Sequence, residues 1–186
     1  PLPISPTLST VNVVCNGDAT GEVELQITGG TSPYVAQIVD DKQVLISTGL
    51  NTVGLDAGDY LFIITDNNDC VETVPFSIDE EEPLIVNIDS VHNQSCSYLN
   101  DGLIAISVFN NQGPYEVFWS HAASQETTVG DLMPGDYSFV VIDDAGCYAT
   151  DSVVVSSIEE ITIQTNFVNA SCINSIDGQI EMDVLG

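Results

Sequence analysis

The chain has 186 residues, with 28 Asp or Glu against a single Lys or Arg, which gives a formal net charge of −27. This charge argues against nucleic-acid binding and against docking on anionic membranes, because both need Lys and Arg. Hydrophobic residues make up 44% of the chain, so it has the apolar side chains that disordered acidic tails lack. No apolar run approaches the roughly 18 residues of a membrane-spanning helix.

Short alternating runs in the first part of the chain predict seven β-strands, separated by Gly, Asn, Asp and Pro. We expect these strands at about residues 7–14, 21–28, 34–39, 43–47, 51–55, 59–65 and 71–78. The same order follows from about residue 84 to residue 155. No stretch has a helical period, so the fold class is all-β, and this density of short strands is typical of an immunoglobulin-like sandwich.

The strands recur because the sequence repeats. A Cys followed six positions later by a Gly occurs three times, each time before an alternating apolar strand. These pairs are Cys15 and Gly21, Cys96 and Gly102, and Cys172 and Gly178. We therefore expect tandem sandwich repeats, arranged end to end, at residues 1–82 and 83–158, with the start of a truncated third at 159–186. Since the chain begins at Pro1 and ends inside a strand-like run, we expect it to belong to a longer polypeptide.

The ordered motifs resemble the SprB repeat, which is similar to the polycystic-kidney-disease-type (PKD-like) and other immunoglobulin-like modules. In the first repeat the matching positions are Cys15 to Gly21, Pro33-Tyr34, Leu55 to Tyr60, and Asp66 to Cys70. In the second they are Cys96 to Gly102, Pro114 to Trp119, Leu132 to Tyr137, and Asp143 to Cys147. The first repeat departs from the second in having Ile38 at the position of Trp119, and Asp69 at the position of Gly146.

The resemblance implies a giant, filamentous adhesin on the surface of gliding bacteria of the Bacteroidota, exported by the type IX secretion system. Its partners would be the other repeats of the same chain, extracellular surfaces or polysaccharide, and the gliding machinery through parts outside this sequence. It would be associated with the outer membrane from outside, without direct membrane insertion. The alternative is a carbohydrate-binding or spacer module of a secreted multidomain protein.

Five cysteines at recurring places predict disulfides, whose pairing stays open. Within one sandwich the turn after the first strand and the turn before the last strand lie at opposite ends, too far apart for a disulfide. Stacked repeats would instead bring Cys15 to Cys147. Cys70, Cys96 and Cys172 would then pair with repeats outside this sequence. The alternative is pairing within repeats, Cys15 with Cys70 and Cys96 with Cys147.

Two further predictions concern surface chemistry. Clustered carboxylates in the turn before the last strand of each repeat suggest a calcium site, although they also suit an ordinary turn; these are Asp66, Asp69, Asp143 and Asp144. The resemblance also implies O-glycosylation at Ser90 and Ser152, each in an Asp-Ser-Val segment.

Catalysis has little support, because His92 and His121 lie in no metal-ligand pattern and no nucleophile motif is present. We expect the single Trp, Trp119, to lie in the core.

Overall fold

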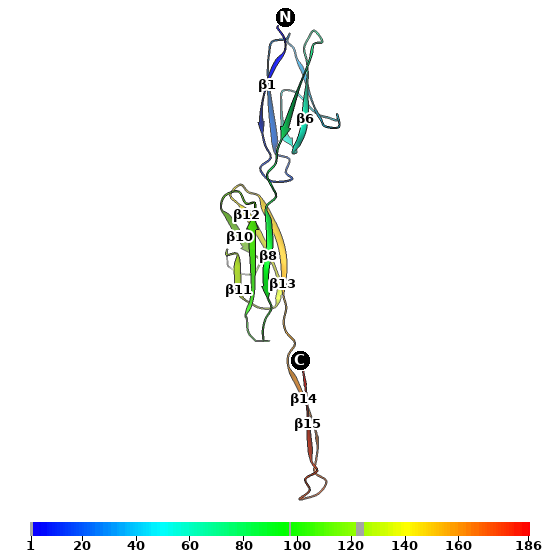
Figure 1. Cartoon of the computed structure of the whole chain (residues 1–186), viewed down its shortest axis with the longest axis vertical. Helices are drawn as coiled ribbons and strands as arrows, with labels where there is room; N and C mark the ends of the chain where they lie inside the picture. The colour runs from blue at the N-terminus through cyan, green and yellow to red at the C-terminus, as the bar shows by residue number, and fades with distance from the viewer. Residues whose placement is uncertain (1, 97, 122–124) are drawn as a thin grey trace. The chain divides into compact units, whose positions relative to one another are not determined.

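The computed structural model describes residues 2–96, 98–121 and 125–186 of the chain (Figure 1). Within these ranges the regular elements are all β-strands. The all-β fold class predicted from the alternation is therefore confirmed. No helix in the same ranges is long and apolar enough to cross a membrane.

The first sandwich has two antiparallel sheets. Its strands are β1 (Ser5–Val11), β2 (Gly21–Thr28), β3 (Val35–Asp40), β4 (Leu45–Thr48), β5 (Asn51–Leu55), β6 (Gly58–Thr65) and β7 (Val71–Ile78). One sheet has the order β1-β2-β5 and the other has the order β4-β3-β6-β7. In immunoglobulin lettering these are the A-B-E and C′-C-F-G sheets, so we call the β1–β2 turn the A–B turn and the β6–β7 turn the F–G turn.

Most of the predicted strands lie where the alternation placed them, and β2, β5 and β7 coincide with the predicted ranges. The first strand differs, because β1 ends at Val11 rather than at residue 14. Val13 instead makes a parallel bridge with Glu80, just after β7, and its side chain is buried. The end of the predicted strand therefore pairs with the chain that leaves the sandwich.

The core of the first sandwich forms from side chains that alternate inward on both sheets. It consists of Val13, Val23, Leu25, Ala36, Ile38, Leu55, Phe62, Ile64 and Ile78. At the start of β6, the Tyr60 hydroxyl donates a hydrogen bond to the Asp56 carbonyl oxygen at 3.0 Å. This is the arrangement of the tyrosine corner of immunoglobulin-like sandwiches. It accounts for the Tyr of the Leu-x2-Gly-Asp-Tyr motif.

The second sandwich repeats this plan. Its described strands are β8 (Ile85–His92), β9 (Gly102–Phe109), β10 (Tyr115–Trp119), β11 (Thr128–Leu132), β12 (Gly135–Asp143) and β13 (Tyr148–Val155). They form sheets with the orders β8-β9-β11 and β10-β12-β13, which correspond to A-B-E and C-F-G. Tyr137 donates a hydrogen bond to the Met133 carbonyl oxygen at 2.9 Å, the second tyrosine corner.

Trp119 is a core residue, as expected from the sequence. It is 7% exposed, and its ring packs against that of Phe139 with the centroids 4.8 Å apart. Its indole N–H donates to the Glu126 carbonyl oxygen at 3.0 Å, so the polar end of the ring is satisfied. The equivalent residue of the first sandwich, Ile38, is fully buried, so the two cores fill the same position with different volumes.

The glycine that follows each A–B turn has a steric cause. A Cβ at Gly21 would lie 2.7 Å from the Leu55 carbonyl oxygen, and a Cβ at Gly102 would lie 2.8 Å from that of Leu132. Real Cβ atoms do not approach so closely, so the β2–β5 and β9–β11 pairings admit only glycine there. The Cys-x5-Gly motif therefore combines a turn cysteine with a packing requirement of the next strand.

The last described strands, β14 (Thr162–Val168) and β15 (Gln179–Leu185), form a two-stranded antiparallel sheet. Every residue of both strands is exposed. The alternation nevertheless gathers apolar side chains on one face, through register pairs such as Ile163 with Val184 and Phe167 with Ile180. The hairpin therefore has a face of core composition that nothing in the described chain covers.

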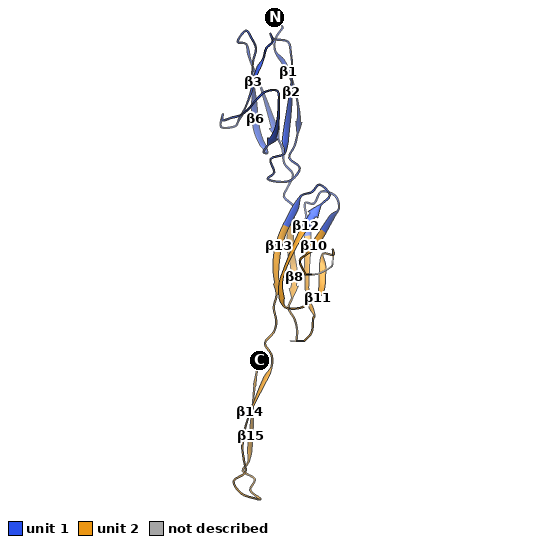
Figure 2. Cartoon of the chain, turned by 180° about the vertical axis from the view of Figure 1, so that it is seen from behind, with its two compact units in different colours: residues 1–85, 108–116, 141–149 blue, residues 86–107, 117–140, 150–186 orange. Residues whose placement is uncertain are grey.

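The chain divides into two compact units (Figure 2). The first comprises residues 1–85, 108–116 and 141–149, and the second comprises residues 86–107, 117–140 and 150–186. The first unit thus includes the first sandwich together with segments 108–116 and 141–149, which hold the β9–β10 and β12–β13 turns and the strand ends beside them.

The core assignment predicts a large loss of stability on substitution of Phe139 by Ala. Phe139 is 1% exposed, so truncation should leave a cavity and lower the free energy of unfolding of the second sandwich by about 3–5 kcal/mol. Phe118, on β10, is 43% exposed, and Phe118→Ala is the matched control, with an expected change below about 1 kcal/mol. Urea unfolding followed by circular dichroism measures both. Equal losses for the two variants would contradict the assignment.

Candidate functional site

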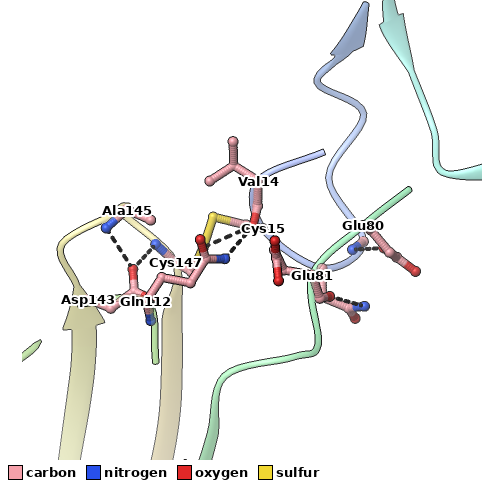
Figure 3. The surroundings of a disulfide bond; sticks show 10 residues. Val14, Cys15, Glu80, Glu81, Gln112, Asp143, Ala145 and Cys147 are labelled. Atoms are coloured by element: carbon pink, nitrogen blue, oxygen red, sulfur yellow. Dashed lines mark hydrogen bonds between the residues drawn. A yellow bond between two sulfur atoms is a disulfide. The ribbon is translucent and has the colours of Figure 1, made fainter. Parts of the chain in front are cut away.

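The structure joins Cys15 and Cys147 in a disulfide, with their Cα atoms 5.3 Å apart and 132 residues between them in sequence (Figure 3). Cys15 lies in the A–B turn of the first sandwich, and Cys147 is the last residue of the F–G turn (the β12–β13 turn) of the second. Both belong to the first compact unit. This is the inter-repeat pairing that the stacking argument favoured.

The alternative pairings within repeats, Cys15 with Cys70 and Cys96 with Cys147, are not formed, because Cys15 and Cys147 are bonded to each other. The remaining cysteines, Cys70, Cys96 and Cys172, are free thiols in the described chain. Cys70 and Cys172 are exposed, and Cys96 is partly buried. Of the five cysteines, the two that are bonded are therefore one A–B turn residue and one F–G turn residue.

A buried carboxylate holds the turn that presents Cys147. Oδ1 of Asp143 accepts hydrogen bonds from the backbone amides of Ala145 at 3.0 Å and Cys147 at 2.9 Å. Its Oδ2 accepts the amide of Gln112 at 2.9 Å. Asp143 is buried, and Gly146 closes the turn in the left-handed region at φ 89°. The carboxylate thus fixes the backbone around the bonded cysteine.

The first sandwich has the same turn. Oδ1 of Asp66 accepts the amides of Asn68 at 2.8 Å and Cys70 at 3.0 Å, and Oδ2 accepts the amide of Thr31 at 2.9 Å. Burial raises the pKa of Asp66, but these backbone hydrogen bonds outweigh it, so its pKa lies below the ordinary value of 3.8. Asp69 occupies the left-handed position, at φ 59°, that Gly146 fills in the second sandwich.

Hydrogen bonds to the chain that leaves β7 anchor the turn that carries Cys15. The Val13 amide donates to the Asp79 carbonyl oxygen at 2.9 Å, and the Asp79 amide donates to Oδ1 of Asn12 at 3.2 Å. Nearer the cysteine, the Gly17 amide donates to Oε2 of Glu80 at 2.8 Å. The A–B turn and the connection after β7 therefore hold each other in place.

A side chain from the second repeat also reaches this turn. Nε2 of Gln112 donates to the Val14 carbonyl oxygen at 2.9 Å, next to the disulfide. The backbone amide of Gln112 donates to the Asp143 carboxylate, as described above. One residue therefore links the F–G turn of Cys147 to the turn of Cys15. The junction thus combines one covalent bond with a neighbouring hydrogen bond.

The sequence did not predict these polar contacts. The two anchoring asparagines could have been found, since Asn12 and Asn93 stand at equivalent positions three residues before Cys15 and Cys96. Gln112 could not, because its counterpart in the first repeat is Thr31, and the motif does not specify this position.

The calcium prediction finds no support in the structure. In the described ranges no group of three or more His, Cys, Asp and Glu side chains could hold a metal ion. The oxygens of Asp66 and Asp143 are occupied by backbone amides instead. Turn chemistry, the competing interpretation, therefore explains Asp66 and Asp143, and calcium binding that involves Asp69 and Asp144 stays a prediction.

The two serines predicted to be glycosylated lie on outer strands of the second sandwich. Ser152, on β13, is exposed and lines a shallow depression over the β10-β12-β13 sheet beside Phe118. Ser90, on β8, is half-buried. Access to a modifying enzyme is therefore better at Ser152, and modification at either serine stays a prediction.

The histidines show no catalytic arrangement. His121 lies edge-on to the Tyr137 ring with the centroids 5.7 Å apart, and its Nδ1 is 2.7 Å from the Ser120 hydroxyl. His92 ends β8 and is exposed. Neither residue has the carboxylate partner and nucleophile that general acid–base chemistry would need among the described contacts.

The junction geometry predicts a specific stability loss when the disulfide is removed. The bridge closes a loop of more than a hundred residues, so the double variant Cys15→Ala/Cys147→Ala should lose on the order of 2–5 kcal/mol against global unfolding. Both variants are made in the 186-residue chain alone, where Cys70→Ala is the control because Cys70 is exposed and unbonded there. Thermal unfolding under non-reducing conditions compares them. An unchanged melting temperature in the double variant, or an equal loss in the control, would refute the role given to the bridge.

The lowered pKa of Asp66 predicts a pH-dependent effect of Asp66→Asn. The ionised native carboxylate contributes stability above the pKa of about 3.9 that it has in the unfolded chain. This contribution is lost as the pH falls through the lower native pKa. The variant should therefore melt below the parent protein at pH 7, and the gap should close towards pH 2. A gap that is constant from pH 7 to pH 2 would mean that the charge of Asp66 plays no part.

Comparison with family models matches residues 7–37 to the SprB repeat. No curated protein matches the chain. Among solved structures, the chain is similar to a C-terminal fragment of intimin in complex with the intimin-binding domain of its translocated receptor, with 11% identity and a TM-score of 0.41 over 87% of this chain and 67% of that one.

It is also similar to the two-domain Ig1–Ig2 segment of DIP-gamma, with 14% identity and a TM-score of 0.38 over 83% of this chain and 98% of that one. A third similar structure is the BSP domain of a biofilm-associated protein, with 14% identity and a TM-score of 0.32 over 83% of this chain. The chain spans only 30% of that structure. By its sequence, the segment from residue 7 to residue 37 matches the SprB repeat, the family that the ordered motifs resemble.

Proposed function

We propose that this chain is a non-catalytic repeat segment of a large filamentous adhesin that a gliding bacterium displays on its surface for motility and attachment. The SprB repeat match supports the coarser part of this proposal, a cell-surface, adhesin-like repeat module. The observation that supports the filament part of the proposal is the disulfide between Cys15 of one repeat and Cys147 of the next. A covalent bond between consecutive repeats serves a chain whose work is to remain connected while it is pulled.

The chemistry of the junction supports a site outside the reducing cytosol. Structural disulfides persist in oxidising compartments, at cell surfaces and in secreted proteins. The charge of −27 is consistent with that setting, because like-charged filaments repel one another and stay apart, most strongly at low salt. An extracellular position, associated with the outer membrane through other parts of the protein, is therefore the localisation that we propose.

A binding module for polysaccharide is the second candidate. It is favoured by one observation, the shallow depression over the β10-β12-β13 sheet, where the half-exposed Phe118 could stack on a sugar ring beside Ser152. In that case Phe118→Ala would abolish retention of the chain on a polysaccharide matrix and leave its fold intact. A spacer would have the same structure as an adhesin segment, but would not move on the cell.

Beads coated with an antibody against this segment, bound to living cells of the source bacterium, test the proposal. We expect the beads to be carried along the cell surface, because a motor-driven filament takes its load with it. Beads coated with non-immune antibody are the control and should not bind. Beads that bind but stay in place would overturn the motility proposal and leave a static adhesin or spacer.

A further inference from the structure

We propose that the Cys15–Cys147 bridge is one link of a continuing series, in which the A–B turn cysteine of every repeat bonds the F–G turn cysteine of the repeat that follows. Cys70 is then the F–G half-site for a preceding repeat. Cys96 is the A–B half-site for the F–G turn of the repeat that β14 and β15 begin, and Cys172 is the half-site for the one after that. The partner of each free thiol is therefore another module of this same kind.

The bonded pair provides the reference for the F–G half-site. Cys70 and Cys147 stand at equivalent positions, and their amides donate to the equivalent carboxylates at 3.0 and 2.9 Å. The carbonyl oxygens of the same two cysteines accept the amides of Asp66 and Asp143, each at 3.0 Å. The difference lies in their surroundings, since Cys147 is 7% exposed beside its partner and Cys70 is exposed.

The A–B half-site is equally well preserved at Cys96. Its carbonyl oxygen accepts the amide of Leu99 at 3.0 Å, as that of Cys15 accepts the amide of Asp18 at 3.1 Å. The chain that leaves β13 is tied to this turn, because the Ser156 amide donates to Oδ1 of Asn93 at 2.9 Å.

The return hydrogen bond is also present, from the Gln94 amide to the Ser156 carbonyl oxygen at 3.2 Å. These two bonds reproduce those that Asn12 and Val13 make to Asp79 in the first sandwich. In both sandwiches the A–B turn cysteine is therefore held beside the chain that leads into the next repeat. A bond formed at Cys96 would meet the same local framework as the bond already formed at Cys15.

The hairpin β14–β15 identifies what carries the partner of Cys96. Its turn contains Cys172, whose carbonyl oxygen accepts the amide of Ser175 at 3.1 Å, as in the other two A–B turns. Its apolar face has the composition of the inward faces of β1 and β2, where Leu8, Val23 and Leu25 pack in the first core. A β-hairpin with such a face needs further strands to cover it. In each of the two preceding sandwiches, the sheet that covers the equivalent face contains the two strands on either side of the F–G turn, and that turn holds a cysteine.

The cysteines, rather than the polar contacts, are the common element of the series. At the formed junction, Nε2 of Gln112 donates a hydrogen bond to the Val14 carbonyl oxygen. The counterpart of Gln112 is Thr31, whose hydroxyl instead accepts a hydrogen bond from Nδ2 of Asn68 at 2.7 Å. A junction at Cys70 would thus lack this hydrogen bond and keep the covalent one. Each bridge forms by thiol–disulfide exchange: two thiols lose two protons and two electrons, and a disulfide-bearing oxidant is reduced to its dithiol.

Peptide mapping of the intact protein, released from cells and alkylated without reduction, tests the series. The chain has one Lys or Arg, so cleavage before Asp is the suitable digestion; it places Cys70 in peptide 69–78, Cys96 in 89–100, Cys147 in 144–150 and Cys172 in 151–176. We expect a disulfide between peptide 69–78 and a Cys-x5-Gly peptide of the preceding repeat. We also expect a disulfide between peptide 89–100 and an F–G turn peptide of the following repeat. The bond between 144–150 and the Cys15 peptide is the internal control. Alkylated Cys70 or Cys96, or bonds between two F–G turns, would overturn the series.

A cysteine variant tests the pairing rule by the number and place of the free thiols, which a purely structural effect would not change in this way. Cys96→Ala should free one thiol, in the F–G turn of the following repeat, as Cys15→Ala should free Cys147. A freed thiol at any other place, or none, contradicts the pairing rule. The mapping needs no measurement of movement, so the series can fail while the adhesin proposal stands, and the reverse also holds.

Discussion

The junction depends on a carboxylate that accepts backbone amides. Asp143 takes three such hydrogen bonds, and through them it shapes the F–G turn, positions Cys147, and holds the backbone of Gln112. An unpaired buried amide costs about as much as a lost hydrogen bond, so a turn of this kind needs such an acceptor. The disulfide can then form with little further loss of backbone entropy, because hydrogen bonds already hold the turns at both of its ends. The acidic residue that the sequence suggested as a metal ligand is therefore a scaffold for the cysteine.

Much of the fold could be predicted from the sequence, because alternation and repetition both carry physical information. The period of two in residues 21–28 follows from one buried and one exposed face, and β2 has that burial pattern. The pairing of Cys15 with Cys147 could be reasoned from strand topology, since opposite ends of one sandwich are too far apart for a disulfide. The recurrence of Gly21 as Gly102 indicated a constraint, and the structure shows it to be a carbonyl oxygen that leaves no room for a Cβ.

Other features could not be predicted, because they depend on contacts between segments distant in sequence. Val13 continues the apolar alternation, yet it leaves β1 and bridges to Glu80, a choice set by the chain that exits β7. Gln112 contacts Val14 across 98 residues of sequence, and no local pattern marks it. The Asp residues of the F–G turns were ambiguous for a different reason. Calcium and backbone amides both favour carboxylate oxygens, and only the donors placed around Asp66 and Asp143 distinguish the two.

The disulfide also changes what a cut in the backbone does to the molecule. All the residues from β2 to β12 lie between Cys15 and Cys147 in the sequence. They include Lys42, which is the only Lys or Arg of the chain and is exposed just after β3. Hydrolysis of any one peptide bond in that stretch leaves two pieces that the disulfide still joins. If every junction carries such a bridge, the enclosed stretches overlap from one repeat to the next. Each point of the fibre interior then has at least one covalent route around it, and a single nick by a protease does not release the distal part.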